Sequence, residues 1–523
     1  MSTRLGQRFV VPVMTVSITF ICIVDGAITT VALPSIARQF QLTAAALDAV
    51  VIVYPVCLGM MIPFSAWLLE RFGGRRMLLL SLAVFTGASV LCGAAPNLPA
   101  LIGARALQGL AAGLLTPTSQ ALLYRTFTNS EQVRLSRLLI IPQQVAPAVA
   151  PLLGGVLVTG LSWRWVFYVN APIGVLAMAF GLLFLAEHRD QPPGRLDLRG
   201  LLLSAAATAA LMYGLCAGPG EGWSAPPVLG SLAVGSVLLA LAVRTELRVR
   251  QPAMRLALFC DRLFRDTNLI CLFGYVPVMG AMFLGPLFVQ DALGGSALDS
   301  GSTTFTEAFG VLLTMQLVGV VYARVGPRVI IGAGLLGVTG VLVLFSTADA
   351  GTGLWTLRGY MFLLGLAMGA FFVPTTIASF TTVAHRDVAH AATLNTVVRQ
   401  TGAALAPAVV TAVLVLGSTG AERVHPPLPA YQHTYLVLAA IAAATALFAF
   451  TMPDAAARKA AATAAPWRGP APRPTTEPTT EPMMEPMTEP MTEPMTEPMT
   501  APTTERATAA GRRPEHRERQ ESH

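Results

Sequence analysis

The chain alternates long apolar runs with short polar connections. Most runs hold about 17–25 residues, the length that an α-helix needs to cross roughly 30 Å of hydrocarbon at about 1.5 Å per residue. Residues 201–216 and 329–344 are apolar on every face, whereas strands of a membrane barrel would alternate in hydrophobicity. The pattern therefore predicts an all-α integral membrane protein.

Fourteen segments have this character. We predict a transmembrane helix in each, at residues 10–33, 46–69, 77–95, 99–123, 137–160, 165–186, 200–217, 227–243, 267–290, 303–322, 328–347, 356–380, 391–416 and 433–451. An even number puts both termini on one side. One set of alternate loops holds eighteen arginines, and the other holds only Arg38, Arg164, Arg358 and Arg423. By the positive-inside rule, both termini are predicted to be cytoplasmic.

The composition changes after the last predicted span. Residues 453–523 are rich in Pro, Thr, Glu and Met, with Thr-Glu-Pro-Met recurring from Thr488. Such a sequence has too little apolar surface to offset the entropy of ordering, so it predicts a disordered cytoplasmic tail. A docking or regulatory role for this tail stays open as an alternative.

Composition and charge exclude several classes of protein. The chain is 54% hydrophobic and only 12% charged, whereas soluble domains have about a quarter of their residues charged. The net charge is +7, but the basic residues lie in alternate loops rather than in a patch, so we expect no nucleic acid partner. Nearly all of them are arginines, which is typical of a GC-rich genome and predicts a bacterial cell membrane as the location.

The sequence contains no recognisable enzyme or nucleotide-binding motif. The only lysine, Lys459, lies in the tail, so the phosphate-binding Gly-x-x-x-x-Gly-Lys motif is impossible and this chain alone cannot pump with ATP. Neither a Gly-x-Ser-x-Gly elbow nor a zinc-binding His–Glu helix occurs, and the six cysteines are scattered. We expect no enzyme activity, no metal and no cofactor.

Several short motifs resemble those of one transporter family. The motifs are AWLLERFGGRR at 66–76, LIGARALQG at 101–109, APLLGG at 150–155, Val24-Asp25 with VALP at 31–34, WRWVF at 163–167, NAPIG at 170–174 and NTVVRQTG at 395–402. Together, over about residues 10–452, they resemble the fourteen-helix drug:proton antiporter family of the major facilitator superfamily. Departures from the family pattern include Ala66, Glu70, Gly74, Ala150, Ala27, Thr30 and Ala323.

The resemblance implies a fold and a mechanism. It implies two six-helix bundles, at 1–190 and 265–452, with two extra helices inserted within 191–264. A small molecule, either a drug or an antibiotic, would bind between the bundles and leave as protons enter, driven by the proton gradient. We expect a monomer in the lipid bilayer and an amphipathic or cationic substrate.

The same resemblance implies two sets of conformational residues. Glu70, Arg71, Gly73 and Arg75 would form an ion-pair latch at a tight glycine turn on the cytoplasmic face. The second set, Pro151, Gly154 and Gly155, would let helices approach closely and bend, although small residues also serve ordinary packing.

Ionisable residues within the membrane are the candidates for proton coupling. Asp25, Arg105 and Glu307 fall well inside predicted helices, where a charge is disfavoured by about 2.5–3.5 kcal/mol unless it faces a cavity or a partner. Asp25 is either a proton-binding carboxylate or half of a structural ion pair, and Arg105 either tunes it or braces two helices. Asp48, Arg358 and Arg399 fall near predicted helix ends, where snorkelling is the simpler account.

Glu307 has two possible roles, and several polar or aromatic residues are candidates for a binding pocket. Glu307 is either a second carboxylate for protons or cationic substrates, or a solvated residue at a cavity mouth. Side chains suited to a pocket for an amphipathic ligand are Tyr54, Gln143, Gln144, Gln316, Phe371 and Phe372. Two rival functions stay open: export of another metabolite on the same scaffold, or a membrane sensor or scaffold that transports nothing.

Overall fold

The computed structural model describes most of the predicted membrane region. The described residues are 2–41, 44–127, 146, 150, 153–187, 197–249, 254–349, 351–418 and 426–453. The chain divides into two units, Met1–Ala465 and Pro466–His523, and the second unit lies outside the described residues. Nearly all of the predicted tail lies outside them as well.

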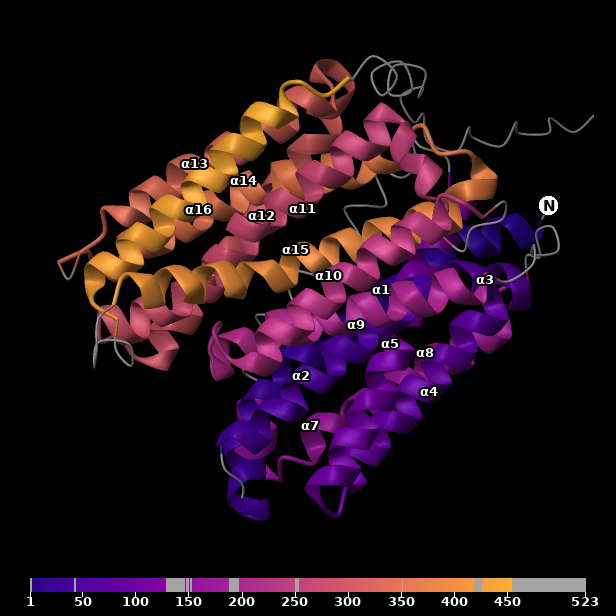
Figure 1. The fold of residues 1–523 in the computed structure, drawn as a ribbon, viewed down its shortest axis with the longest axis horizontal. Helices are drawn as coiled ribbons and strands as arrows, with labels where there is room; N and C mark the ends of the chain where they lie inside the picture. Colours follow the sequence, from indigo (N-terminus) through magenta and orange to yellow (C-terminus); the bar gives the residue numbers. More distant parts are fainter. Residues whose placement is uncertain are drawn as a thin grey trace, which may run out of the picture. The chain divides into compact units, whose positions relative to one another are not determined.

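The described part of the chain is helical throughout (Figure 1). The first half contains α1 (Ser2–Phe40), α2 (Ala44–Met61), the 3₁₀ turn η1 (Ile62–Phe64), α3 (Ser65–Phe72), α4 (Gly74–Ala94), α5 (Leu98–Thr126), α7 (Trp165–Tyr168) and α8 (Asn170–Phe184). Two helices follow, α9 (Leu198–Glu221) and α10 (Pro226–Glu246). The second half contains η2 (Leu256–Cys260), α11 (Arg262–Leu287), the π-turn η3 (Phe288–Ala292), α12 (Ala297–Val325), α13 (Pro327–Ser346), α14 (Leu354–Phe380), η4 (His385–Asp387), α15 (Val388–Leu416) and α16 (Leu428–Ala449).

These helices confirm the prediction of an all-α integral membrane fold. Twelve described helices are long and apolar enough to cross a membrane. α12 falls on the predicted span 303–322 but is not among the twelve, and most of the predicted span 137–160 lies outside the described residues. The count of fourteen spans therefore stays a prediction.

Two predicted spans are interrupted in the structure: the run at 165–186 forms α7 and α8, with Val169 between them, and a second interruption lies nearer the N-terminus. The apolar run at 46–69 forms α2, then η1, then α3, because Pro63 in η1 lacks the N–H that a continuous α-helix would need. The break separates the apolar α2 from the short α3, which carries Glu70. At the end of α3, Gly73 adopts φ +86°, a conformation that residues with a side chain rarely take.

Each half packs around its own apolar core. In the first half α5 contacts α1, α2 and α4, and α8 packs on α1 and α4. In the second half α11 contacts α14, α15 and α16, while α13 packs on α14 and α16. The halves meet through α15, which contacts α3, η1 and α5, and α9 lies against both α2 and α15.

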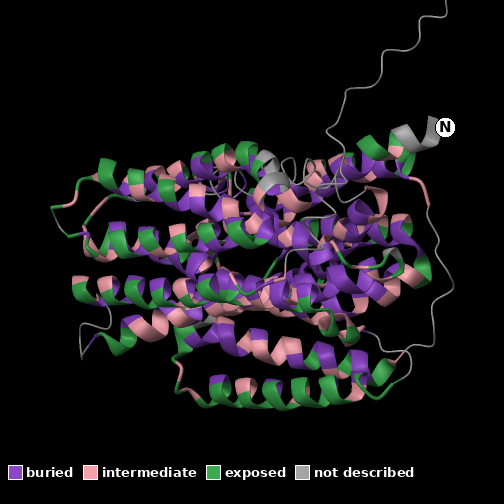
Figure 2. Cartoon of the chain, turned by 90° about the horizontal axis from the view of Figure 1, so that it is seen from above, coloured by how far each residue is buried: buried purple, intermediate pink, exposed green. Residues whose placement is uncertain are grey.

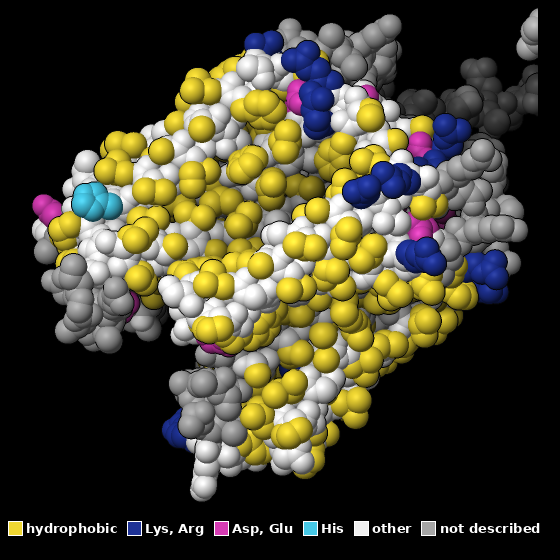
Figure 3. All heavy atoms as spheres, in the orientation of Figure 1, with side chains coloured by type: hydrophobic (Ala, Val, Ile, Leu, Met, Phe, Trp, Pro, Cys, Tyr) yellow, Lys and Arg dark blue, Asp and Glu magenta, His cyan; other side chains and the backbone are white. Residues whose placement is uncertain are grey.

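The outer surface is apolar, as a lipid solvent requires. Large apolar side chains on α10, such as Leu229, Val237 and Leu241, are about half exposed, and the buried residues face the interior (Figure 2). The space-filling view shows hydrophobic side chains over most of the visible face, with Lys and Arg gathered mainly toward one end of the helices (Figure 3). Because such a surface is unfavourable in water, the chain is a multi-pass membrane protein.

Close approach of α2 and α5 depends on glycine. A Cβ placed on Gly109 of α5 would lie 2.5 Å from the carbonyl oxygen of Tyr54 and 3.0 Å from Cys57 Cβ, both on α2. Since backbone cannot move aside as a side chain does, any larger residue would push the two helices apart. This contact fixes the position of Tyr54, which matters for the site described below.

We therefore expect Gly109→Ala to destabilise the fold by about 1–3 kcal/mol because of overpacking. Gly103→Ala, on the same helix, is the matched control, because a Cβ at Gly103 meets no atom within 4 Å. Thermal unfolding in detergent should show a lower Tm for Gly109→Ala and an unchanged or higher one for Gly103→Ala. Equal Tm values for the two variants would contradict the close packing of α2 on α5.

Candidate functional site

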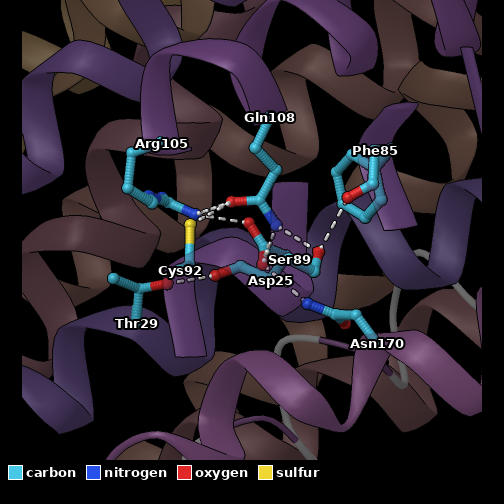
Figure 4. A network of polar contacts seen from close by, with 8 residues as sticks. All are labelled: Asp25, Thr29, Phe85, Ser89, Cys92, Arg105, Gln108 and Asn170. Carbon is cyan, nitrogen blue, oxygen red and sulfur yellow. Dashed lines mark hydrogen bonds and ion pairs between the residues drawn. The ribbon is translucent and has the colours of Figure 1, made fainter. Parts of the chain in front are cut away.

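The deepest polar feature of the first half is Asp25, in the middle of α1. Its side chain is completely buried and accepts three hydrogen bonds (Figure 4). Arg105 Nη1 lies 2.6 Å from Oδ2, while Gln108 Nε2 and Asn170 Nδ2 donate to Oδ1 at 2.8 and 2.7 Å. The carboxylate thus has both a neutralising cation and two neutral donors, as burial of a charge demands.

Gln108 connects these groups into one network. Its Oε1 accepts from Arg105 Nη1 at 2.7 Å, and its Nε2 also donates to Ser89 Oγ at 2.7 Å. Ser89 in turn donates to the carbonyl oxygen of Phe85 at 3.0 Å. The network joins α1, α4, α5 and α8, so all of its members belong to the first half.

Arg105 is held between aromatic rings as well as by the carboxylate. The guanidinium carbon lies 4.3 Å from the ring centroid of Tyr54 and 5.8 Å from that of Phe167. Arg105 Nε and the Tyr54 hydroxyl are buried without a hydrogen-bond partner. The Tyr54 ring therefore makes a cation–π contact with Arg105, and a change in the charge balance of the Asp25–Arg105 pair would alter that contact.

A cavity of about 350 Å³ lies between the two halves. Tyr54 and Cys22 belong to its wall, and Cys22 precedes Asp25 by about one turn of α1. The other lining residues are Thr19, Ile23, Leu58, Ile62, Ala112, Gly113, Thr116, Gln120, Tyr275, Met279, Met282, Met368, Phe372, Thr396, Arg399, Gln400 and Ala403. Tyr54 thus stands between the cavity and the Asp25 network.

The halves are joined at the end of the molecule that carries α3. His390 Nε2 lies 3.2 Å from Glu70 Oε1, and the hydroxyls of Ser65 and Thr393 lie 2.7 Å apart. The rings of Tyr124 and Phe380 stack at 4.0 Å beside them. These contacts close this end of the interface with groups that are almost all buried.

The predicted proton-coupling residues occupy two places. Asp25 and Arg105 form the buried pair. Glu307 is also buried, but it lies in α12 against α14, where its backbone touches Gly365, and it is not among the residues that line the cavity. Its Oε1 has no hydrogen-bond partner in the described structure.

Of the predicted substrate-binding residues, Tyr54 and Phe372 line the cavity. Phe371 is fully buried instead, with its ring centroid 6.0 Å from that of Tyr275, and Gln316 is exposed on α12. The structure does not describe Gln143, Gln144 or Pro151, all of which lie outside the described residues.

The predicted conformational residues have different surroundings in the structure. Glu70 pairs with His390, Arg71 is exposed, and Arg75 donates to the carbonyl oxygen of Leu182 at 2.6 Å. Gly154 packs against α1, where an added Cβ would lie 3.0 Å from Ile28 and Val31, whereas Gly155 faces open space.

Sequence reasoning gives no role in the site to Gln108, Asn170 or Tyr275. Gln108 lies one turn after Arg105 on the same face of α5, which is a signal that could have found it. Asn170 stands in a quoted motif. The sequence places Arg399 near a predicted helix end, where snorkelling is the simpler account, but α15 begins at Val388, so Arg399 lies deeper and lines the cavity together with Tyr275.

The arrangement is that of a polytopic helical membrane protein with a central cavity between two helical bundles. Residues 15–260 match the family profile of the Major Facilitator Superfamily. A Mycobacterium tuberculosis protein, "Multidrug resistance protein Stp", is 31% identical over 397 residues, covering 76% of this chain and 74% of that protein. "Multidrug resistance protein B homolog" of the same organism is 29% identical over 398 residues, covering 75% and 73%.

A solved structure shares the fold. The human organic anion transporter MFSD10 aligns with a TM-score of 0.56 at 12% identity, covering 84% of this chain and 98% of that one. The chain belongs to the major facilitator superfamily, and it is a transporter rather than an enzyme.

The buried pair predicts non-additive stability effects. Removing either partner leaves a buried charge without compensation, which costs about 3–5 kcal/mol, whereas removing both leaves neutral amides. We expect the double variant Asp25→Asn/Arg105→Gln to unfold at a higher temperature than Arg105→Gln alone. A thermal-shift cycle of the four proteins measures this, and strictly additive effects would contradict the pairing.

Proposed function

We propose that this chain exports amphipathic small molecules, drugs or an antibiotic among them, by alternating access coupled to proton entry. The observation that carries the proposal is the position of the Asp25–Arg105 pair behind Tyr54, a wall residue of the central cavity. Tyr54 thus contacts both the proposed proton site and the proposed cargo site. The names of the relatives, which speak of multidrug resistance, support the choice of cargo.

Proton binding would act through the charge balance of the pair. A proton on Asp25 removes the negative charge that neutralises Arg105, and the guanidinium is then a buried cation without a counter-ion. That state is unfavourable unless Arg105 moves or water enters. Either change disturbs Tyr54, whose ring lies 4.3 Å from the guanidinium carbon, and with it the cavity wall.

The effect of cargo binding on proton binding gives export its direction. Cargo that prefers the cavity shape of the intact pair favours release of the proton, since linkage between two binding events is reciprocal. Protons would bind Asp25 when the network opens to the outer compartment and leave when it opens to the cytoplasm. The energy source is the proton gradient.

Alternating access requires the closed end to open. Glu70–His390, Ser65–Thr393 and the Tyr124–Phe380 stack all join the two halves, so cargo can enter from that end only after they separate. The positive-inside prediction assigns this end to the cytoplasm. Cytoplasmic termini and a monomeric state complete the proposal.

Proton coupling is tested by Asp25→Asn. In inside-out vesicles, addition of a transported drug should collapse the pH gradient in the parent and not in Asp25→Asn, because an amide cannot carry the proton. Asp266→Asn is the matched control: Asp266 is also buried and lies 3.1 Å from Arg265, but it is not a residue of the cavity wall. Equal collapse in all three proteins would remove Asp25 from the coupling.

Alternating access is tested by locking the closed end. In a background without native cysteines, Ser65→Cys/Thr393→Cys should form a disulfide on oxidation and stop transport, with recovery on reduction. Each single cysteine variant should transport normally under oxidant. Full transport by the cross-linked protein would show that the two halves need not separate here.

A further inference from the structure

The wall of the central cavity carries one kind of charge. Among the described lining residues Arg399 is the only charged side chain, and none is acidic. Between α5 and residue 153 the structure describes only Phe127, Ala146 and Ala150, and the predicted span 137–160 contains no Asp or Glu in its sequence. The described wall of the cavity is therefore positive.

Arg399 lacks the neutralisation that Arg105 has. Among the described residues, the ionisable groups that interact with it are the phenols of Tyr275 and Tyr124 and the thiol of Cys271, and Tyr275 also shares a side-chain hydrogen bond with it; none of these groups is a carboxylate. Its guanidinium carbon lies 5.8 Å from the Tyr275 ring centroid, and its Nε is buried without a hydrogen-bond partner. A cation in this position is incompletely compensated, and a ligand that brings a negative charge would supply what the protein does not.

The two carboxylates of the membrane region do not change this balance. Asp25 is sealed behind Tyr54 and neutralised by Arg105, so that pair contributes no net charge. Glu307 lies in α12 against α14 and is not among the cavity residues. Neither carboxylate is placed to receive a cationic cargo from the cavity in this conformation.

The rest of the wall suits an apolar body with a few polar atoms. Met279, Met282, Met368 and Phe372 form a flexible apolar surface, since methionine adapts its shape to different partners. The amide oxygen of Gln120 is buried without a hydrogen-bond partner, as is the hydroxyl of Tyr54. A volume of about 350 Å³ lies within the range of small-molecule sites.

We propose that the cargo is an organic anion: an aromatic or aliphatic body that carries a carboxylate or sulfonate, whose charge pairs with Arg399 while the body packs on the methionines and Phe372. The proposal rests on the proposed export function and narrows the substrate class of the same cavity. An organic cation of equal size would meet a like charge in a site partly shielded from water, so the cavity selects against it.

The test compares anions with cations of similar size. Inside-out vesicles with the full chain would be energised and given two aromatic carboxylates, carboxyfluorescein and pyrenebutyrate, and two aromatic cations, ethidium and rhodamine 6G. We expect the parent to accumulate the carboxylates at least tenfold better than the cations. Arg399→Gln should lose at least tenfold of carboxylate uptake, and Arg399→Lys should retain most of it because the charge remains.

The control variant is Arg328→Gln, which removes an exposed arginine that is not a residue of the cavity wall and should leave carboxylate uptake unchanged. Gel filtration of each variant reports folding, and if Arg399→Gln misfolds, the parent's own selectivity and Arg399→Lys still decide. Uptake of cations but not carboxylates would overturn the inference and leave export standing. No uptake of either class, with no proton flux, would overturn both.

Discussion

The structure depends on the neutralisation of one buried carboxylate. Asp25 has no contact with solvent, and a charge in that position survives only with a counter-ion and further donors around it. Arg105 and Gln108 supply these from α5, and Asn170 supplies one from α8. The first half must therefore pack with α1, α5 and α8 in one fixed arrangement, and Gly109 brings α2 close enough for Tyr54 to cover the pair.

Arg105, behind the cavity wall, and Arg399, which lines the cavity, differ in their electrostatic surroundings. Arg105 has a carboxylate at 2.6 Å and is shielded by Tyr54, while Arg399 lines the cavity without an acidic partner in the described structure. The first arrangement suits a group whose charge balance changes with a proton. The second suits a group that binds a charged ligand, and in the proposed mechanism the proton and the cargo therefore occupy separate sites next to the same cavity wall.

Much of this could be predicted from the sequence, and the remainder could not for identifiable reasons. Hydropathy located the described helices because length and apolar character are local properties, but Pro63 split one span into two helices and a 3₁₀ turn. Position alone singled out Asp25 and Arg105 as buried ionisable groups. Their pairing, and the parts of Gln108 and Asn170, depend on how four helices turn toward each other, which periodicity does not determine.

The charge of the cavity wall was the property that the sequence predicted least well. Arg399 looked like a helix-end residue because the start of α15 at Val388 lies earlier than the predicted one, so its depth was underestimated. For Glu307 the sequence leaves open a second carboxylate or a residue at a cavity mouth, because the close packing of α12 on α14, at Gly310 and Gly365, is not visible in a single helix. In both cases the direction of the side chain decides its role.

The most direct test of the account is the release of protons when cargo binds. Purified full-length protein in weakly buffered detergent would receive a transported compound while the pH is recorded, with binding followed in parallel. The account predicts that the parent acidifies the solution on binding, whereas Asp25→Asn binds the compound more weakly and releases no protons even at saturating compound. Equal proton release by both proteins would contradict the central role of Asp25.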